Sequence, residues 1–324
     1  MVTKEYSLGM VSELPEFAEM AKRICDRDNE YGAQMANLDF VTFCAMAGWD
    51  PQWICDGYNR LIEVRQAGNQ IYYPLYTDEE LAADPAVFER YMVRFPAKEK
   101  APFIVVSAGG GYMGCAAMIE AYPTCVHFQD AGIHAFSLNY RCLQNAAAPN
   151  PIDDLAYAVS YIRAHAQELN VDPDRYAVCG FSAGGHLTAC FGAESIGWKH
   201  YGLPKPELVV LGYPVVTMGE KSHESTRQFF LGANLGNQEM ADLYSAEKQV
   251  TADYPPTYVW QCARDNAVPI ENTQYLADAL EASGVPHIYK TYDSDFHGWG
   301  GGDGTPAEGW VEQAAAFWKE TARG

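Results

Sequence analysis

The stretch Val178-Cys179-Gly180-Phe181-Ser182-Ala183-Gly184-Gly185-His186 decides the fold. A short apolar run ends in Gly-x-Ser-x-Gly and passes directly into a helix-forming segment, which is the pattern of a nucleophile elbow. A serine hydroxyl is a weak nucleophile unless a base lies beside it and a sharp turn exposes its oxygen. The flanking glycines leave room for such a turn, because a Cβ there would crowd the strand or the helix. The motif also occurs by chance, so the prediction of a catalytic serine depends on partners elsewhere in the chain.

A carboxylate and a histidine follow Ser182 in the chain order that such hydrolases use, Ser, then Asp or Glu, then His. Asp265 stands in the polar turn after an apparent buried strand from Thr257 to Cys262. His297 stands in a glycine-rich loop after the next apparent strand. We therefore predict that Ser182, Asp265 and His297 form a catalytic triad. Asp295, two residues before His297, is expected to shape that loop rather than to replace Asp265.

Candidate oxyanion donors lie upstream of the serine. The apparent strand Phe103 to Ser107 is followed by Ala108-Gly109-Gly110-Gly111-Tyr112. Consecutive glycines let backbone N–H groups approach a substrate oxygen without obstruction by side chains. We predict that the N–H groups of Gly110, Gly111 and Ala183 form the oxyanion hole. These elements, in this order and each after an apparent strand, predict a serine hydrolase that works through an acyl-enzyme.

With these motifs the chain resembles the α/β-hydrolases of the acetyl-esterase and acetyl-xylan-esterase-like type, neighbours of the hormone-sensitive-lipase group. The resemblance runs from about Ile71 to Phe317 and rests on Gly109-Gly110-Gly111-Tyr112, Leu138-Asn139-Tyr140-Arg141, Gly180 to His186, Tyr254-Pro255-Pro256-Thr257, Asp265 to Pro269 and His297-Gly298-Trp299. Family members often have Pro or His where this chain has Ala108, so the detailed shape of the oxyanion loop is not carried over. The resemblance implies an α/β-hydrolase fold, no cofactor, and short-chain esters as substrates, with acetylated oligosaccharides as the leading expectation.

Strands alternate with helices after Phe103, which predicts a mostly parallel sheet with helices on both faces. We predict an α/β-hydrolase catalytic domain over residues 69–324 and an N-terminal helical extension over residues 1–68 that packs on it. Apolar residues recur at helical spacing from Leu14 to Cys25 and from Trp53 to Ile62. The extension is expected over the acyl-binding side of the cleft, at the subunit contact of a homo-oligomer, or as a plain outer layer of the core.

Several side chains near these motifs have both a functional and a structural interpretation. Tyr112, beside the oxyanion loop, and Trp299, beside His297, are candidate substrate contacts that could stack on a sugar ring or line a short acyl pocket; core packing is the alternative. His186, on the elbow helix, is expected to be a packed structural histidine. His223 falls in a polar stretch that is expected to belong to a cap over the site.

Composition limits the classes of function. The chain has 324 residues, 48% of them hydrophobic, and can bury one large core. Its net charge of -20 disfavours nucleic acids and anionic membranes as partners. Residues 1–10 lack a basic segment followed by an apolar core, and no apolar run is long enough to span a bilayer. Nine cysteines without a Cys-x-x-Cys pair indicate reduced thiols, so we expect a cytoplasmic protein. No compact ligand cluster such as His-Glu-x-x-His is present, so we expect no metal.

The leading interpretation is a serine esterase that acts on a small-molecule or oligosaccharide ester. A peptidase or amidase would use the same triad and would differ in how well it protonates the leaving amine. A non-catalytic member of the fold would usually lack a triad residue, and this chain lacks none. The remaining alternative is a protein that binds a partner through its N-terminal helices, with hydrolysis as a secondary activity.

Overall fold

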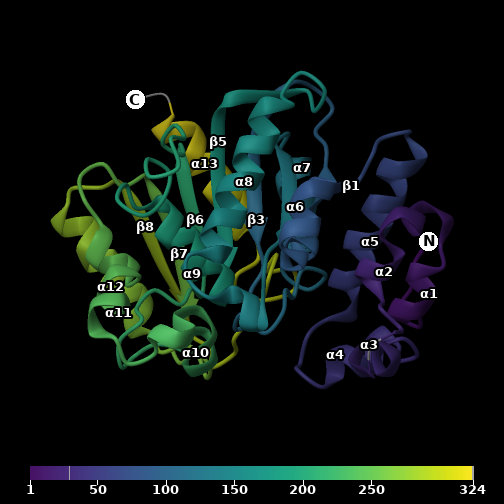
Figure 1. Ribbon diagram of the computed structural model, residues 1–324, viewed down its shortest axis with the longest axis horizontal. Helices are drawn as coiled ribbons and strands as arrows, with labels where there is room; N and C mark the ends of the chain where they lie inside the picture. The colour runs from purple at the N-terminus through teal and green to yellow at the C-terminus, as the bar shows by residue number, and fades with distance from the viewer. Residues whose placement is uncertain (29, 323–324) are drawn as a thin grey trace.

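A computed structural model describes residues 1–28 and 30–322, and its central element is a single sheet (Figure 1). The last two residues of the predicted domain 69–324 therefore lie outside the described residues. Within the described part the sheet has eight strands in the order β1-β2-β4-β3-β5-β6-β7-β8. β2 pairs antiparallel with β1 and β4, and all neighbours from β4 to β8 are parallel. The prediction of a mostly parallel sheet is confirmed.

The strands are β1 (Tyr72–Pro74), β2 (Tyr91–Phe95), β3 (Ala101–Ser107), β4 (His134–Asn139), β5 (Val171–Phe181), β6 (Leu208–Gly212), β7 (Thr257–Cys262) and β8 (His287–Tyr292). The α-helices are α1 (Leu8–Ser12), α2 (Ala21–Ile24), α3 (Glu30–Met35), α4 (Phe40–Ala45), α5 (Pro51–Gln66), α6 (Asp78–Ala83), α7 (Ala121–Asp130), α8 (Asn150–Ala164), α9 (Ser182–Gly192), α10 (Glu224–Leu231), α11 (Gln238–Leu243), α12 (Glu271–Ala282) and α13 (Trp310–Thr321). Short 3₁₀ turns include η1 (Pro15–Met20) and η3 (Leu143–Ala146).

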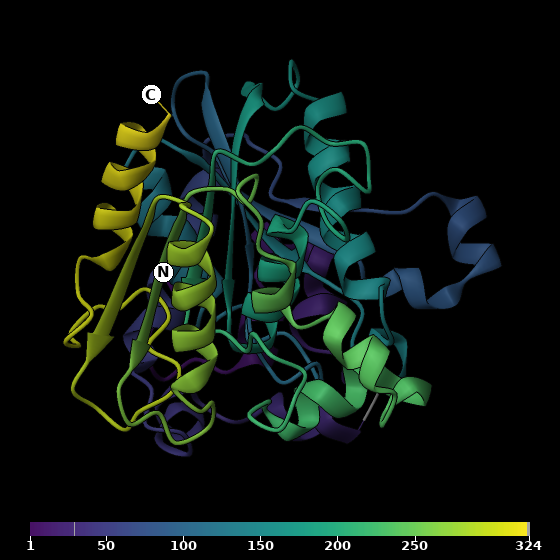
Figure 2. The same ribbon diagram turned by 90° about the vertical axis from the view of Figure 1, so that its left-hand side faces the viewer.

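Helices cover both faces of the sheet. One apolar cluster joins α8, α9 and α12 to the sheet through residues such as Leu155, Leu187 and Leu276. A second cluster joins α5, α7 and α13 to the opposite face. Figure 2, seen from the β8 edge, shows α12 and α13 on opposite sides of the strands. Because both faces are covered, the central strands β6 and β7 are buried along their whole length, as expected for a parallel sheet.

The carboxyl ends of the parallel strands meet at one edge of the sheet. Ser107 pairs with Gly180, Phe181 pairs with Gly212, and Cys262 pairs with Tyr292, so β3, β5, β6, β7 and β8 end nearly level. The loops after these strands therefore gather the predicted site residues in one place. This is the edge at which open α/β sheets place their ligands.

The N-terminal helices pack against the α7 side of the sheet, at the right of Figure 1. The Tyr58 ring of α5 meets the Tyr122 ring of α7 edge to face at 5.7 Å, and the Trp53 indole donates to the Asp303 carbonyl at 3.1 Å. The buried side chains of the extension thus join the same apolar cluster as α7 and α13. None of the described helices combines the length and the apolar character that crossing a membrane requires.

The predicted single helix from Leu14 to Cys25 is wrong in detail. A 3₁₀ turn, η1, is followed by the short helix α2, and the backbone leaves helical geometry at Met20. Phe17 and Met20 are both buried, and residues three apart lie on the same side of a 3₁₀ turn, which has three residues per turn. The burial of both side chains therefore agrees with a 3₁₀ turn in place of the expected α-helix.

Candidate active site

Ser182 is the first residue of α9 and follows β5 directly. Its φ of +49° lies in the left-handed region, which costs a non-glycine residue of the order of 1–3 kcal/mol. The turn is so tight that no residue with a Cβ fits in place of its two glycines. A Cβ on Gly180 would lie 2.3 Å from the Gly184 carbonyl oxygen, and one on Gly184 would lie 2.2 Å from the Ala108 carbonyl oxygen. The predicted elbow geometry is present.

His297 links Ser182 to Asp265. Its Nε2 lies 3.0 Å from the Ser182 Oγ, and its Nδ1 lies 2.8 Å from the Asp265 Oδ2. An ionised carboxylate can only accept, so Nδ1–H donates to Asp265 and leaves the Nε2 lone pair facing the serine hydroxyl. The structure thus brings together all three residues of the predicted triad.

Asp265 is held rigidly in its turn. Its Oδ1 accepts the N–H groups of Ala267 and Val268, each at 2.9 Å, and its Oδ2 accepts the Gln261 amide at 3.1 Å. Its side chain has no exposed surface. Asp295 takes a different position, because its backbone carbonyl accepts the Asn266 N–H at 3.1 Å and joins the two loops. The carboxylate beside His297 is that of Asp265.

The glycine loop after β3 lies against the serine. A Cβ on Gly109 would lie 2.7 Å from the Ser182 Cβ. Over the described residues, neither the Gly110 nor the Gly111 N–H donates to another protein group. Ala183 is the second residue of α9, where a backbone N–H has no partner within the helix. The three predicted oxyanion donors are therefore free to bind an oxygen.

The structure buries Tyr112 completely, which favours core packing over the predicted substrate contact for this ring. Tyr112 has no exposed surface, since its hydroxyl bonds to the His186 Nδ1 at 2.9 Å and its ring stacks on Phe230. The Tyr112 ring turns inward to partners that are distant in the chain. Trp299 stacks on Trp260 and is 7% exposed, close to the 6% of Ser182 itself, so its contact with substrate stays a prediction.

His186 has the structural role that the sequence predicts. Its Nε2 lies 2.8 Å from the Tyr244 carbonyl oxygen, so it donates there and leaves Nδ1 to accept from Tyr112. Burial lowers the pKa of His186 to about 4, so the ring is neutral at ordinary pH. It has no contact with Ser182 of the kind that a second base would need.

Two segments flank the triad. His223 lies just before α10 and beside Gly111, since a Cβ on Gly111 would lie 3.4 Å from the His223 Cε1. From the N-terminal extension, the Trp49 Nε1 would lie 3.4 Å from a Cβ on Gly298, next to the triad histidine. His223 therefore lies beside the oxyanion loop, and Trp49 of the extension lies beside the triad loop; the expected cap and the three expected places of the extension stay predictions.

Two residues of the site were missed by the sequence interpretation, Glu120 and Tyr213. The Glu120 carboxylate accepts the Gly109 N–H at 2.5 Å and the Tyr213 hydroxyl at 2.9 Å. The Tyr213 ring meets the His297 ring at 4.8 Å. The sequence feature that could have indicated Glu120 is its carboxylate, which stands alone among the apolar residues 115–122.

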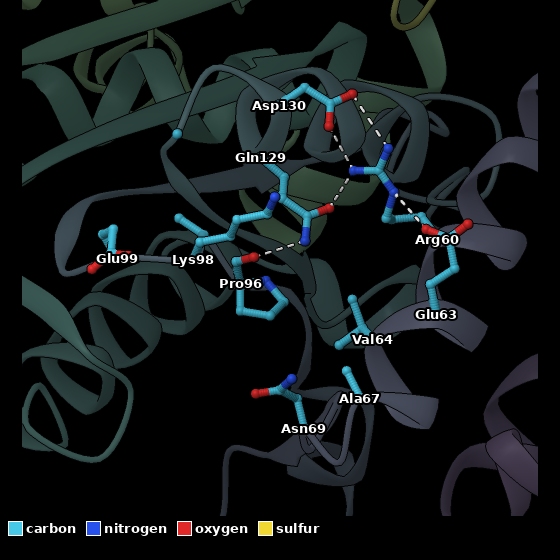
Figure 3. Close-up of a pocket in the computed structure, with 12 residues that line it drawn as sticks. Arg60, Glu63, Val64, Ala67, Asn69, Pro96, Lys98, Glu99, Gln129 and Asp130 are labelled. Carbon is cyan, nitrogen blue, oxygen red and sulfur yellow. Dashed lines mark hydrogen bonds and ion pairs between the residues drawn. The ribbon is translucent and has the colours of Figure 1, made fainter.

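A groove of about 740 Å³ lies away from Ser182, between α5 and the end of β2 (Figure 3). On its α5 side Arg60 bonds to Gln129 and Asp130 and pairs with Glu63. Gln129 in turn donates to the Pro96 carbonyl. Lys98 and Glu99 also line the groove and form no ion pair within the described residues, but one charge of each sign does not single out a ligand.

A mostly parallel sheet with a serine elbow after one strand, and with acid and histidine following in that order, defines an α/β-hydrolase. Residues 92–280, more than half of the chain, match the model of the BD-FAE family. The chain belongs to the BD-FAE family.

Three relatives illustrate the similarity. The chain is 32% identical over 204 residues to an endo-1,4-beta-xylanase B of Butyrivibrio fibrisolvens, covering 60% of this chain and 32% of that protein. It is 29% identical over 204 residues to an acetylxylan esterase of Xylanibacter ruminicola. This match covers 61% of this chain and 41% of that protein. The crystal structure of an acetyl ester-xyloside bifunctional hydrolase from Caldicellulosiruptor lactoaceticus is 30% identical, with a TM-score of 0.68, over 78% of this chain and 96% of that one.

The matched region thus spans about a third to two fifths of these two curated relatives. The comparisons confirm the resemblance to acetyl-xylan-esterase-like α/β-hydrolases, and relatives named as esterases support the prediction of an esterase.

Proposed function

We propose that this protein is a serine carboxylic-ester hydrolase that acts through an acyl-enzyme on short-chain, acetyl-type esters. One observation carries the proposal: Ser182 Oγ lies 3.0 Å from His297 Nε2, and His297 Nδ1 lies 2.8 Å from the buried Asp265 carboxylate. This is the hydrogen-bonded order of nucleophile, base and orienting acid that acyl transfer requires.

The chemistry proceeds in two steps. His297 takes the proton of Ser182 as its oxygen attacks the ester carbonyl, and then gives that proton to the leaving alcohol. The N–H groups of Ala183, Gly110 and Gly111 hold the negative charge that develops on the carbonyl oxygen. In the second step His297 takes a proton from water, the hydroxide attacks the acyl-enzyme, and the acid leaves with Ser182 reprotonated. Asp265 keeps the proton on Nδ1 and stabilises the imidazolium.

Acetylated oligosaccharides are the substrate class that we propose. Relatives named acetylxylan esterase and acetyl ester-xyloside hydrolase support it. Ser182 is only 6% exposed, from which we infer that the space for the acyl group is small; a small space rejects long chains by overpacking. His223 beside Gly111 adds a polar group next to the oxyanion loop, which suits a hydroxylated alcohol.

The proposal places the enzyme in the cytoplasm, where it would act on oligosaccharides rather than on the whole polymer. The nine cysteines are all free thiols, which agrees with a reducing compartment. The net charge of -20 argues against nucleic acid as a partner.

A substrate panel tests the proposal. p-Nitrophenyl acetate, propionate, butyrate and octanoate, acetylated xylo-oligosaccharides and matched p-nitroanilides are compared, with Ser182→Ala as the blank. We expect kcat/KM to be highest for acetyl and propionyl esters, acetate release from the oligosaccharides, and little anilide cleavage. A preference for octanoate, or efficient anilide cleavage with negligible turnover of acetyl esters, would contradict the proposal.

A further inference from the structure

Glu120 is a buried carboxylate at the centre of the site that the triad chemistry leaves unexplained. It immediately precedes α7 and is 5% exposed. Among the described residues no lysine or arginine forms an ion pair with it. A carboxylate buried without a cation is costly, so its hydrogen-bond partners identify its role.

One oxygen of Glu120 holds the oxyanion loop. The Gly109 N–H donates to Oε2 at 2.5 Å, and Gly109 lies against Ser182. The next two residues in the loop, Gly110 and Gly111, carry the N–H groups that the proposed function assigns to the oxyanion hole. Their direction therefore depends on where Gly109 is held.

The other oxygen of Glu120 holds the histidine loop through Tyr213. The Tyr213 hydroxyl donates to Oε1 at 2.9 Å and accepts the Gly300 N–H at 3.0 Å. Gly300 lies three residues after His297, and the Tyr213 ring packs against the His297 ring at 68°. A single carboxylate thus connects the loops on the two sides of the serine.

The charge of Glu120 is also coupled to His297. Burial raises the pKa of Glu120, and the Gly109 N–H, the Tyr213 hydroxyl and the charged form of His297 lower it. Such coupling is reciprocal, so the ionised carboxylate favours the imidazolium. The other groups that face His297 are Asp265, which also favours the imidazolium, and His223, whose pKa is lowered by burial and by the positive charge of His297.

We propose that Glu120 is a positioning residue for the reaction, which holds the oxyanion loop through Gly109 and the histidine loop through Tyr213, and supplies a second negative charge to the imidazolium. The proposal rests on the proposed serine-hydrolase function. Glu120 does not touch the reacting atoms and acts through Gly109, Tyr213 and His297.

Glu120→Gln tests the proposal, because it keeps the size and removes the charge. Glu89→Gln is the matched control, since Glu89 also accepts one backbone N–H, from Cys142 at 2.7 Å, and one side-chain donor, Asn145 at 2.8 Å, without contact to the triad. Two rates are followed from pH 5 to 9: turnover of p-nitrophenyl acetate and labelling of Ser182 by a fluorophosphonate. Circular dichroism checks that each variant is folded.

We expect Glu120→Gln to lower kcat by about tenfold or more with KM within about threefold of wild type. The midpoint of the acidic limb should move to lower pH in both assays, because the imidazolium loses a stabilising charge. Glu89→Gln should change neither. A folded Glu120→Gln whose acidic midpoint equals that of wild type in both assays overturns the proposal, whatever its kcat.

Tyr213→Phe keeps the test decisive if Glu120→Gln does not fold. It should lower kcat several-fold at unchanged KM, and a wild-type kcat in this variant overturns the proposal. The labelling assay separates this inference from the substrate assignment. A wild type that is labelled at Ser182 but does not hydrolyse esters disproves the proposed substrate, while its labelling profile still tests Glu120.

Discussion

The His297 imidazole is bonded through Nδ1 to Asp265, 32 residues earlier in the chain, while Asp295, two residues before it, contributes a backbone carbonyl to the joined loops. Proximity in sequence therefore does not select the acid. The acid is selected by the turn after β7, because two backbone N–H groups of this turn hold the Asp265 carboxylate in place.

Asp265→Asn should lower kcat by about 10³- to 10⁴-fold, because an amide no longer fixes the histidine tautomer. His297→Ala should be nearly as damaging as loss of the serine, since the three residues act as a unit. Asp295→Asn, in the same loop region, is the control and should retain most activity. Steady-state rates with p-nitrophenyl acetate check this, and a larger loss in Asp295→Asn than in Asp265→Asn would show that the wrong acid has been chosen.

Asp154 forms a buried ion pair with Arg141, apart from the triad. It has no exposed surface and bonds to the Arg141 Nε at 3.0 Å and to its backbone N–H at 2.8 Å. Asp154→Asn should lower the free energy of unfolding by about 3–5 kcal/mol, because Arg141 and Arg90 lose the fully buried carboxylate that they share, and only the partly exposed Asp84 and Asp153 remain beside Arg141. The neighbouring Asp153→Asn, at a side chain that is 38% exposed, should cost less than about 1 kcal/mol. Denaturant unfolding compares the two, and equal losses would contradict the burial argument.

His127 makes stability depend on pH. Its Nε2 lies 2.9 Å from Asp303 and its Nδ1 3.0 Å from Glu312. The Asp303 hydrogen bond, with a smaller contribution from Glu312, raises the pKa of His127 against the effect of burial. A raised folded-state pKa stabilises the fold fully below the unfolded value, and this stabilisation is lost as pH rises through the folded value.

His127→Gln should therefore lower the melting temperature more at pH 5.5 than at pH 8.5. The pairs are partly exposed, so the contribution should be only about 0.5–1 kcal/mol. At pH 5.5 Asp303 remains ionised, because His127 lowers its pKa. Thermal melts at the two pH values measure the difference, and an equal loss at both would contradict the ion pairs.

Much of the site could be predicted from the sequence because its signals are local. The Ser182 elbow, the three glycines and the acid after β7 each stand directly after an apolar strand, and the parallel sheet brings strand ends together. The positions of Glu120 and Tyr213 could not be predicted, since they are 93 residues apart and meet only through packing. Tyr112 was misjudged for the same reason: its partner His186 lies 74 residues away and draws the ring inward.

The N-terminal extension should be needed for a soluble, correctly shaped catalytic domain. A chain that begins after Val64 would expose the α7 surface around Tyr122 and would lose the Trp49 contact beside Gly298. We expect low soluble yield or an altered preference for acyl chain length. Expression trials and the ester panel measure both, and a soluble truncation with unchanged activity and preference would count against this role.

The central claim is that Ser182 becomes acylated, and trapping the acyl-enzyme tests it most directly. The wild type is mixed with excess p-nitrophenyl acetate, quenched in acid within milliseconds, and analysed by intact-mass and peptide mass spectrometry, with folded Ser182→Ala as the control. We predict one acetyl group per chain, located on Ser182 and absent from the variant, whose steady turnover should fall by roughly 10⁴-fold or more. Acetylation at another residue, or undiminished turnover in Ser182→Ala, would contradict the account.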